Sequence, residues 1–209
     1  MHPNPSFRKT PVTDALAFAA ERGFGVLAVN GPEGPISAHV PFTLHDDGAL
    51  LRAHLMRSNP VFRVLRDGKV PALMTVSGPD GYISPDWYGV VDQVPTWNYL
   101  AVTLRGSLSA LPDGSLRGVL DDLSDEFETR LAPKAPWRIG KMTPSVRDRM
   151  MRMIAPIEMT IAGVESTFKL GQNKPDPARK AAAEAMQSTG IGQEVAALAT
   201  MMHDLERDS

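Results

Sequence analysis

The sequence contains no cysteine. That absence excludes disulfides, thiolate metal sites and cysteine nucleophiles, and it fits a reducing compartment. Long apolar runs are also missing: none approaches the roughly 20 residues that a membrane helix needs. The N-terminal segment MHPNPSFRKT has no apolar core of the kind found in secretory signals. We therefore expect a cytoplasmic protein with no membrane segment.

Neither sign of charge dominates the chain. Its 22 Lys and Arg residues against 24 Asp and Glu residues give a formal net charge of −2. A protein of this charge has no general attraction to phosphate backbones, and the two predicted C-terminal helices lack the basic stripe that would place one in a DNA groove. The sequence therefore argues against direct DNA binding.

The familiar catalytic signatures are absent as well. No GxGxxG opens a helix, and neither HExxH, GxSxG nor GxxxxGK followed by Ser or Thr occurs. Dinucleotide-fold, zincin, α/β-hydrolase and P-loop functions thus lose their usual support. A metal site built from His39 and His54 with His45 or Asp46 is an alternative, but this spacing matches no familiar ligand pattern, and we predict no metal.

Aromatic residues are few, at 6% of the chain, yet two of the three tryptophans and all three tyrosines lie between Gly78 and Gly106. Prolines exclude a long helix there, and the β-favouring residues after Asn98 predict a strand. The pattern therefore predicts a long aromatic loop that leads into a strand. Two interpretations stay open: a surface for a flat, π-rich ligand, or rings that plug a barrel end or a subunit interface.

Hydrophobic patterns divide the remaining chain into short strands and amphipathic helices. Strands are predicted over 24–30, 35–42, 49–55, 70–77, 98–111 and 157–162, and helices over 13–22, 60–68, 115–128, 143–154, 176–190 and 192–206. The mixture indicates an α+β fold in which the strand over 157–162 closes a barrel. We expect one domain over 1–175 and a helical extension over 176–209, which packs on that domain or on a partner subunit.

The segment MRSNP combines three features that suit phosphate binding. Asn59 can cap a helix that begins at Pro60, Ser58 supplies a hydroxyl, and Arg57 supplies a guanidinium. The alternative interpretation is an ordinary capped helix beside a solvated arginine. Together with the histidines and the aromatic rings, this helix start fits a planar phosphorylated ligand better than a metal.

Five collinear segments make the chain recognisable: SAHVP (37–41), HLMRSNP (54–60), GPDGYISPDWY (78–88), VPTWNY (94–99) and KLGQN (169–173). Over nearly the full chain they resemble the PaiB family, described as FMN-binding negative transcriptional regulators. One position departs from the pattern, because the family usually has serine where Gly171 stands. The hydroxyl that serine would supply is therefore missing here.

The resemblance implies an FMN-binding split β-barrel related to pyridoxamine phosphate oxidases and flavin reductases. It further implies peripheral helices, a C-terminal helical pair, and a homodimer with FMN at the subunit interface. By position, Arg57, Ser58 and Asn59 would hold the phosphate. Ser37 and His39 would lie beside the flavin ring or ribityl chain. The full set of expected cofactor-binding residues is Ser37, His39, His54, Arg57, Ser58, Asn59, Trp97, Asn98, Tyr99, Lys169, Gln172 and Asn173.

The resemblance leaves more than one function open. In the first, the protein binds and senses FMN or a related ligand and acts as a negative transcriptional regulator by an indirect route. In the second, it is a flavin-dependent oxidoreductase that relies on the hydride chemistry of the flavin itself. A third is a haem-binding split barrel, in which a histidine would serve as axial ligand.

Overall fold

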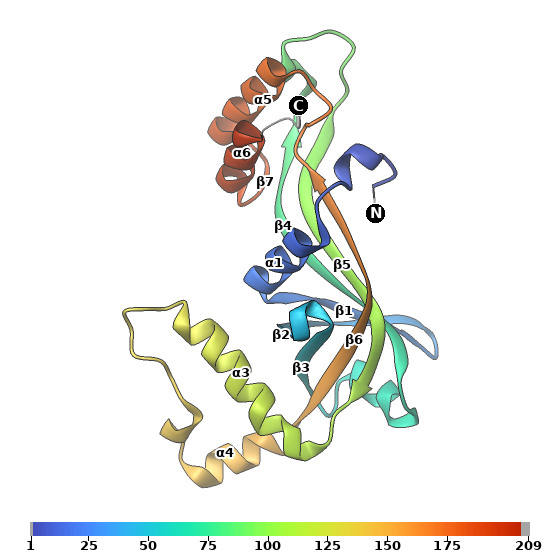
Figure 1. Ribbon diagram of the computed structural model, residues 1–209, viewed down its shortest axis with the longest axis vertical. Coiled ribbons are helices and arrows are strands. Elements are labelled where there is room, and N and C mark those ends of the chain that lie inside the picture. The colour runs from blue at the N-terminus through green and yellow to red at the C-terminus, as the bar shows by residue number, and fades with distance from the viewer. Residues whose placement is uncertain (1, 206–209) are drawn as a thin grey trace. The chain divides into compact units, whose positions relative to one another are not determined.

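The computed structural model describes residues 2–205, and the chain divides into two compact units. The first, here called the barrel unit, consists of Leu16–Val76 and Thr103–Val164. The second, called the aromatic unit, consists of Met1–Ala15, Ser77–Val102 and Glu165–Ser209. Strands β4 (Val70–Ile83), β5 (Thr96–Ala110) and β6 (Ile154–Lys169) each belong partly to one unit and partly to the other (Figure 1).

Antiparallel strands build the barrel unit. Strands β1 (Phe24–Gly31), β2 (Gly34–His45) and β3 (Leu50–Met56) pair in sequence, and β3 then pairs with β6. The strand order is β1-β2-β3-β6-β5-β4, and β1 also pairs with β4 through Val26–Val29 and Ala72–Thr75. The β1–β4 pairing closes the barrel, whereas β6, where we expected closure, lies between β3 and β5.

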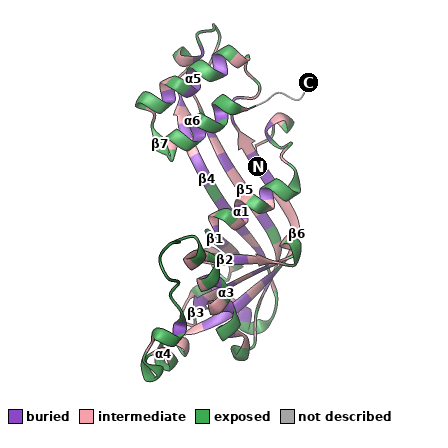
Figure 2. Ribbon diagram, turned by 60° about the vertical axis from the view of Figure 1, so that its left-hand side comes forward, coloured by how far each residue is buried: buried purple, intermediate pink, exposed green. Residues whose placement is uncertain are grey.

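The barrel core follows the period of two that the sequence predicts for half-buried strands. Leu51, Ala53 and Leu55 of β3 are buried, while Arg52 and His54 between them are partly exposed. Strand β1 and most of β4 show the same alternation of buried and less buried residues, which appears as stripes along β4 in Figure 2. Strand β3 ends at Met56, so the MRSNP segment lies where this strand passes into α2.

Helices surround the strands, and most begin and end within a few residues of the predicted positions. Helix α3 covers β2 and β3 through its buried Leu116, Val119 and Leu123. The α-helices of the first 164 residues are α1 (Val12–Arg22), α2 (Pro60–Val64), α3 (Leu116–Thr129) and α4 (Pro144–Met151). The 3-10 helices of the same part are η1 (Pro5–Phe7), η2 (Asp46–Gly48), η3 (Leu65–Asp67), η4 (Pro85–Tyr88), η5 (Asp113–Ser115) and η6 (Ile139–Lys141).

Three of the predicted helices begin without a capping hydrogen bond from a side chain. Thr13 lies inside α1, where its hydroxyl contacts the Asp14 carboxylate, and the backbone carbonyl of Pro11 accepts the first helical hydrogen bonds. Ser115 and Thr143 precede α3 and α4, but their side chains make no capping hydrogen bond. Helix starts were predictable there, but the side-chain caps were not.

Asn59 is the predicted cap that the structure confirms. Its Oδ1 accepts a hydrogen bond from the backbone nitrogen of Val61 at 2.9 Å, and Pro60 occupies the first helical position. The helix is shorter than predicted, because α2 gives way at Leu65 to the 3-10 turn η3, which Gly68 ends at φ 120°. A helix this short has a weak dipole, so the side chains around it carry more of any anion binding.

The Asn59→Ala variant should lower the free energy of unfolding by about 1 kcal/mol, because the cap bond to Val61 is lost. The loss should be the same with and without bound ligand. Chemical denaturation monitored by circular dichroism measures it, with Asn59→Ser as a control that keeps a capping oxygen. Equal stability of the alanine variant and the wild type would contradict the assignment.

The aromatic unit differs from the prediction, because β4 continues as a strand to Ile83 instead of turning into a loop at Gly78. Two features outside the local sequence hold this strand. Strand β7 (Gly192–Gln193) pairs with Asp80 and Gly81, and a side chain at Gly81 would come within 2.7 Å of the Met186 sulfur. The loop is therefore confined to Ser84–Pro95, which includes η4.

Two helices, α5 (Asp176–Thr189) and α6 (Val195–Asp204), lie side by side in the aromatic unit (Figure 1). Leu198 and Met202 of α6 are buried, as its apolar stripe predicts. The helices occupy the predicted extension, although the division at 175/176 stays a prediction. No helix within residues 2–205 is long and apolar enough to cross a membrane.

A buried arginine fastens the two helices to each other. Arg179 of α5 is only 1% exposed, and its guanidinium donates to the backbone carbonyls of Met202, His203 and Leu205 at the end of α6. The same guanidinium pairs with Asp176 at 3.2 Å. Cationic groups stabilise the C-terminal ends of helices, so Arg179 serves α6 as a capping group from a neighbouring helix.

Candidate functional site

The residues expected to bind the cofactor fall into two sets, one in each unit. The barrel unit holds Ser37, His39, His54, Arg57, Ser58 and Asn59, and the aromatic unit holds Trp97, Asn98, Tyr99, Lys169, Gln172 and Asn173. Each set is described within its own unit.

The end of β3 brings the three expected phosphate ligands together. Arg57 follows the strand directly, its backbone nitrogen donating to Met153, and Ser58 is exposed beside it. Asn59 uses its Oδ1 in the helix cap, which leaves its amide nitrogen as the donor that it can offer. The junction thus presents a guanidinium, a hydroxyl and an amide within three consecutive residues.

Arg57 is not a free cation in this arrangement. Its Nη2 lies 2.6 Å from Asp113 Oδ1 in η5, and its Nε donates to the backbone carbonyl of Arg152 at 3.2 Å. The Arg57 side chain is 36% exposed and that of Asp113 is 73% exposed, so this ion pair is accessible to solvent and weak. A phosphate with two negative charges can compete with the single carboxylate for the guanidinium.

His54 has an unsatisfied nitrogen three residues before Arg57. Its Nδ1 is buried and has no hydrogen-bond partner among the described residues. Burial lowers the pKa of His54, which keeps the imidazole neutral near pH 7. A buried polar atom without a partner is costly unless another molecule satisfies it, so this nitrogen marks a position where a ligand group or a water fits.

Ser37 and His39 lie on β2, and both are exposed. The His39 ring stacks on Phe24 of β1, with ring centroids 6.3 Å apart and the planes inclined by 28°. Phe24 is itself 53% exposed, so the pair presents an open aromatic surface on the barrel. Among residues 2–205 no cluster of three or more histidine and carboxylate side chains is arranged to hold a metal.

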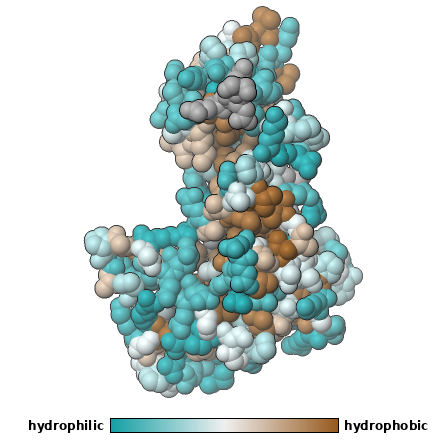
Figure 3. Space-filling model, in the orientation of Figure 1, coloured by the Kyte–Doolittle hydropathy of each residue, from teal (hydrophilic) through white to brown (hydrophobic). Residues whose placement is uncertain are grey.

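In the aromatic unit, exposed rings and aliphatic side chains gather on β5 and on the loop before it. Trp97 is 46% exposed and meets Tyr82 edge to face, with ring centroids 6.3 Å apart. Trp97 and Tyr99 also line a shallow cavity of about 240 Å³. Apolar atoms stand at the tip of the loop between η4 and β5 (Figure 3), where Val91 is 83% exposed.

Two of the expected residues in this unit have structural roles. Asn98 is completely buried, and its Nδ2 donates to the sulfur of Met202 at 3.3 Å. Gln172 closes the turn after β6: its Oε1 accepts from the backbone nitrogen of Leu170, and its Nε2 donates to the carbonyl of Phe168. Asn173 is exposed, and Lys169 is partly buried beside the Thr96 hydroxyl.

Gly171 stands between these side chains at φ 78°, a conformation that favours glycine. A β-carbon there would lie 3.5 Å from Arg179 Cγ and 3.6 Å from Asn98 Nδ2, which is ordinary contact. Asn98 Oδ1 and Arg179 Nε are both buried, and neither has a hydrogen-bond partner within residues 2–205. A serine hydroxyl at this position would therefore lie near two polar atoms that lack a hydrogen bond, and glycine has no side chain that could supply one.

We expect Gly171→Ala to lower the free energy of unfolding by about 1 to 2 kcal/mol, because the left-handed backbone strains any β-carbon. Gly171→Ser should lose less than Gly171→Ala, since its hydroxyl can bond to Asn98 or Arg179. Denaturant titrations of the two variants and the wild type measure the difference. If Gly171→Ser has the same free energy of unfolding as Gly171→Ala, the serine hydroxyl makes no hydrogen bond to these two buried atoms.

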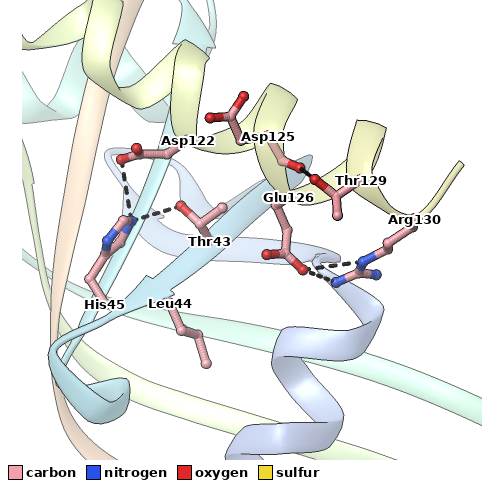
Figure 4. Close-up of a pocket in the computed structure, with 8 residues that line it drawn as sticks. All are labelled: Thr43, Leu44, His45, Asp122, Asp125, Glu126, Thr129 and Arg130. Atoms are coloured by element: carbon pink, nitrogen blue, oxygen red, sulfur yellow. Dashed lines mark hydrogen bonds and ion pairs between the residues drawn. The ribbon is translucent and has the colours of Figure 1, made fainter. Parts of the chain in front are cut away.

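A cavity that sequence reasoning missed lies between β2 and α3 in the barrel unit (Figure 4). It measures about 470 Å³, and the side chains of His45, Asp122 and Glu126 line it. His45 Nε2 lies 2.9 Å from Thr43 Oγ1 and 3.8 Å from Asp122 Oδ2. Its carboxylates would repel a phosphate, so this cavity does not suit the phosphate of a flavin nucleotide.

Comparison with known proteins supports a single family. The model of the family described as "Putative FMN-binding domain" matches residues 1–163. The chain is 28% identical over 170 residues to "Protease synthase and sporulation protein PAI 2" of Bacillus subtilis, with 80% of each chain covered. The resemblance to the PaiB family is thereby confirmed.

Solved structures resemble the chain in fold. The FAD and heme binding protein from Mycobacterium smegmatis superposes with a TM-score of 0.57 at 19% identity, covering 89% of this chain and 82% of that one. The flavocytochrome Anf3 from Azotobacter vinelandii gives 0.56 at 13% identity, covering 81% and 72%. The expected α+β split-barrel fold is confirmed. Because the family match covers most of its length, the chain belongs to this family of FMN-binding domains, and a flavin is the cofactor that the family assigns to it.

Proposed function

We propose that the chain is a flavoprotein that binds FMN with its phosphate at the junction of β3 and α2. The observation that carries this proposal is the grouping of the accessible Arg57 guanidinium and Ser58 hydroxyl at the end of β3, the strand that also carries His54, whose buried Nδ1 has no partner among the described residues. Cationic and hydroxyl donors suit a phosphate, and the neutral imidazole nitrogen suits a polar group of the ribityl chain or ring. The donor set present therefore fits a flavin nucleotide.

In this proposal the residues of the barrel unit bind and orient the cofactor. Arg57 exchanges the Asp113 carboxylate for the phosphate, Ser58 donates a second hydrogen bond, and Asn59 holds α2 in place. Ser37 and His39 remain expected contacts of the ring or ribityl chain. When bound, the flavin supplies hydride or single-electron transfer. The aromatic-unit residues, which include Trp97, stay predictions of the family resemblance.

We further propose that the protein acts as a homodimer that senses the flavin or its redox partner and represses transcription by an indirect route. The name of the Bacillus relative, which refers to protease synthesis and sporulation, supports a regulatory role. The formal net charge of −2 supports an indirect route, since DNA binding gains most of its affinity from phosphate contacts. The cytoplasmic location expected from the composition stays a prediction.

One observation supports each of the two other functions. The exposed aromatic surface of Phe24 and His39 would suit a small substrate of a flavin-dependent oxidoreductase. The buried Nδ1 of His54, which has no partner in the described part of the chain, could instead be an axial ligand in a haem-binding barrel, and the two similar structures are described as an FAD and heme binding protein and a flavocytochrome. Both rank below flavin binding, because the family match names FMN.

The absorption spectrum of the protein saturated with each cofactor tests the proposal. We expect flavin bands that stay with the protein during gel filtration after addition of FMN, and a light-scattering mass of two chains. A Soret band after addition of haem, without retention of FMN, would replace the proposal with the haem function. Retained FMN that is reduced by NAD(P)H and reoxidised by an added acceptor would support the oxidoreductase. A persistent mass of one chain would contradict the dimer.

A further inference from the structure

The shallow cavity of the aromatic unit combines two accessible rings with a carboxylate. It lies on the neighbouring strands β4 and β5 and measures about 240 Å³. Trp97 and Tyr99 of β5 line it, and β4 contributes Ser77 and Asp80. Trp97 is 46% exposed and Tyr99 is partly exposed, so a ligand in the cavity can contact both rings.

Contacts around the cavity hold its carboxylate and its indole in place. Asp80 Oδ1 accepts a hydrogen bond from the backbone nitrogen of Gln193 in β7 at 3.0 Å. The Tyr82 ring meets the Trp97 ring edge to face, with 73° between the two planes. Leu100, which is 2% exposed, lines the cavity as well. A ligand would therefore meet groups that are already oriented, which lowers the entropy cost of binding.

Asp80 has acceptor capacity left for a ligand. A carboxylate offers about four lone-pair positions, and the bond to Gln193 uses one of them. Within residues 2–205 no lysine, arginine or histidine side chain forms an ion pair with Asp80. The carboxylate is therefore available to a positively charged group that enters the cavity.

The charges around the cavity favour a cation. Between Ser77 and Val102 the chain contains three aspartates and no lysine, arginine or histidine. Lys169 of β6 reaches this stretch at the Thr96 hydroxyl. Thr96 and Trp97 are successive residues of a strand, so their side chains point to opposite faces of the sheet. The Lys169 ammonium thus contacts the face opposite to the one that carries Trp97.

We propose that this cavity binds a small organic ammonium ion, whose positive charge contacts the Asp80 carboxylate and the Trp97 and Tyr99 rings. Aromatic faces attract cations, and aromatic rings are the groups with which proteins recognise quaternary ammonium ligands. A cavity of about 240 Å³ is smaller than the roughly 300 to 1,000 Å³ of pockets for drug-sized molecules, so the ligand is small. This amine is a second ligand, separate from the flavin whose phosphate we place at Arg57.

Isothermal titration calorimetry with choline at low salt tests the site, and 3,3-dimethylbutan-1-ol serves as the uncharged analogue of the same shape. We expect choline to bind and the alcohol to bind at least about tenfold more weakly, because the alcohol lacks the charge that the carboxylate and the rings attract. If choline does not bind, or binds no more tightly than the alcohol, the proposal is overturned.

Asp80→Asn should weaken choline binding by about tenfold, because it removes the charge and keeps an oxygen for the bond to Gln193. Asp86→Asn is the matched control, since Asp86 is exposed in the same unit and does not line the cavity. It should bind choline as the wild type does. An affinity of Asp80→Asn equal to that of the control would refute the assigned role of the carboxylate and with it the site.

Two substitutions of Trp97 test the rings, and they keep the proposal testable if Asp80→Asn does not fold. Trp97→Leu should weaken choline by about tenfold, whereas Trp97→Phe should lose less, because phenylalanine keeps an aromatic face. Both variants should bind 3,3-dimethylbutan-1-ol alike. Equal losses of choline affinity in the two variants would show that the ring adds only apolar surface, which contradicts the proposal.

The flavin distinguishes this site from that of the cofactor, because Trp97 and Tyr99 are also expected flavin contacts. Choline should bind with the same affinity to the protein saturated with FMN as to the protein without it. If FMN abolishes choline binding, the flavin fills the cavity and the second-ligand site is refuted. If FMN fails to bind while choline still binds, the function proposed above fails and the ammonium site stands.

Discussion

Arg57→Ala is expected to weaken FMN binding by roughly ten- to a hundredfold or more, because a hydrogen bond to a charged group contributes about 1.5 to 3 kcal/mol. Riboflavin, which lacks the phosphate, should bind as well to the variant as to the wild type. Fluorescence titration of both flavins measures the effect, and the ratio of the two affinities is the informative quantity. The ratio is insensitive to a general loss of folded protein, which would weaken both ligands alike.

Asp113 provides the companion variant. It holds Arg57 at 2.6 Å in the structure, so Asp113→Asn should free the guanidinium and strengthen FMN binding without a change for riboflavin. In the Arg57→Ala background the same substitution should have no effect, because the group with which Asp113 competes is gone. Equal weakening of both flavins by Arg57→Ala would place the phosphate elsewhere, and Lys169 would be the first residue to test.

Arg179→Met should destabilise the protein by on the order of 3 kcal/mol, because methionine fills the space but leaves the carbonyls at the end of α6 without donors. The side chain is 1% exposed, so water cannot easily take its place. For a chain of this length the loss corresponds to a fall of about 10 °C in Tm, measured by differential scanning calorimetry. Helical circular dichroism should fall as well, because the end of α6 frays.

Lys180→Met is the control for that substitution, since Lys180 follows Arg179 in the same helix and is exposed. It should change stability by less than about 0.5 kcal/mol. If Arg179→Met is as stable as Lys180→Met, the hydrogen bonds to Met202 and Leu205 add nothing beyond what solvent supplies. Arg179→Lys should fall between the two, because an ammonium cannot reach several carbonyls at once.

The sequence predicted elements better than contacts. The strand over 49–55 and the cap at Asn59 depend on local patterns, and both occur, the strand as β3 (Leu50–Met56). The strand through Gly78 to Ile83 could not be predicted from local patterns, because one of its partners is the two-residue strand β7, more than a hundred residues later. Proline and glycine in this stretch indicated a loop, and pairing with β7 outweighed that local preference.

In the candidate site, too, local patterns predicted residues but not their distant contacts. The resemblance and the local motif identified Arg57, and no sequence signal pointed to Asp113 as its partner, because the contact joins segments 56 positions apart. Likewise Asn98, which stays an expected cofactor contact, is buried and bonded to Met202, a contact that joins segments 104 positions apart. A motif shows that a residue matters, while its burial and its partners decide whether it can touch a ligand.

The two units are made of interleaved segments of the chain, and this sets the order in which they are completed during synthesis. Every segment of the barrel unit has been synthesised once Val164 emerges, whereas the aromatic unit still waits for 165–209. Domains generally fold as units during synthesis, so the stretch 77–102 must remain without its final partners until the last helix appears. A messenger RNA truncated after codon 164 would therefore yield a chain that lacks β7, α5 and α6 and exposes Gly81 where Met186 and Leu198 should pack.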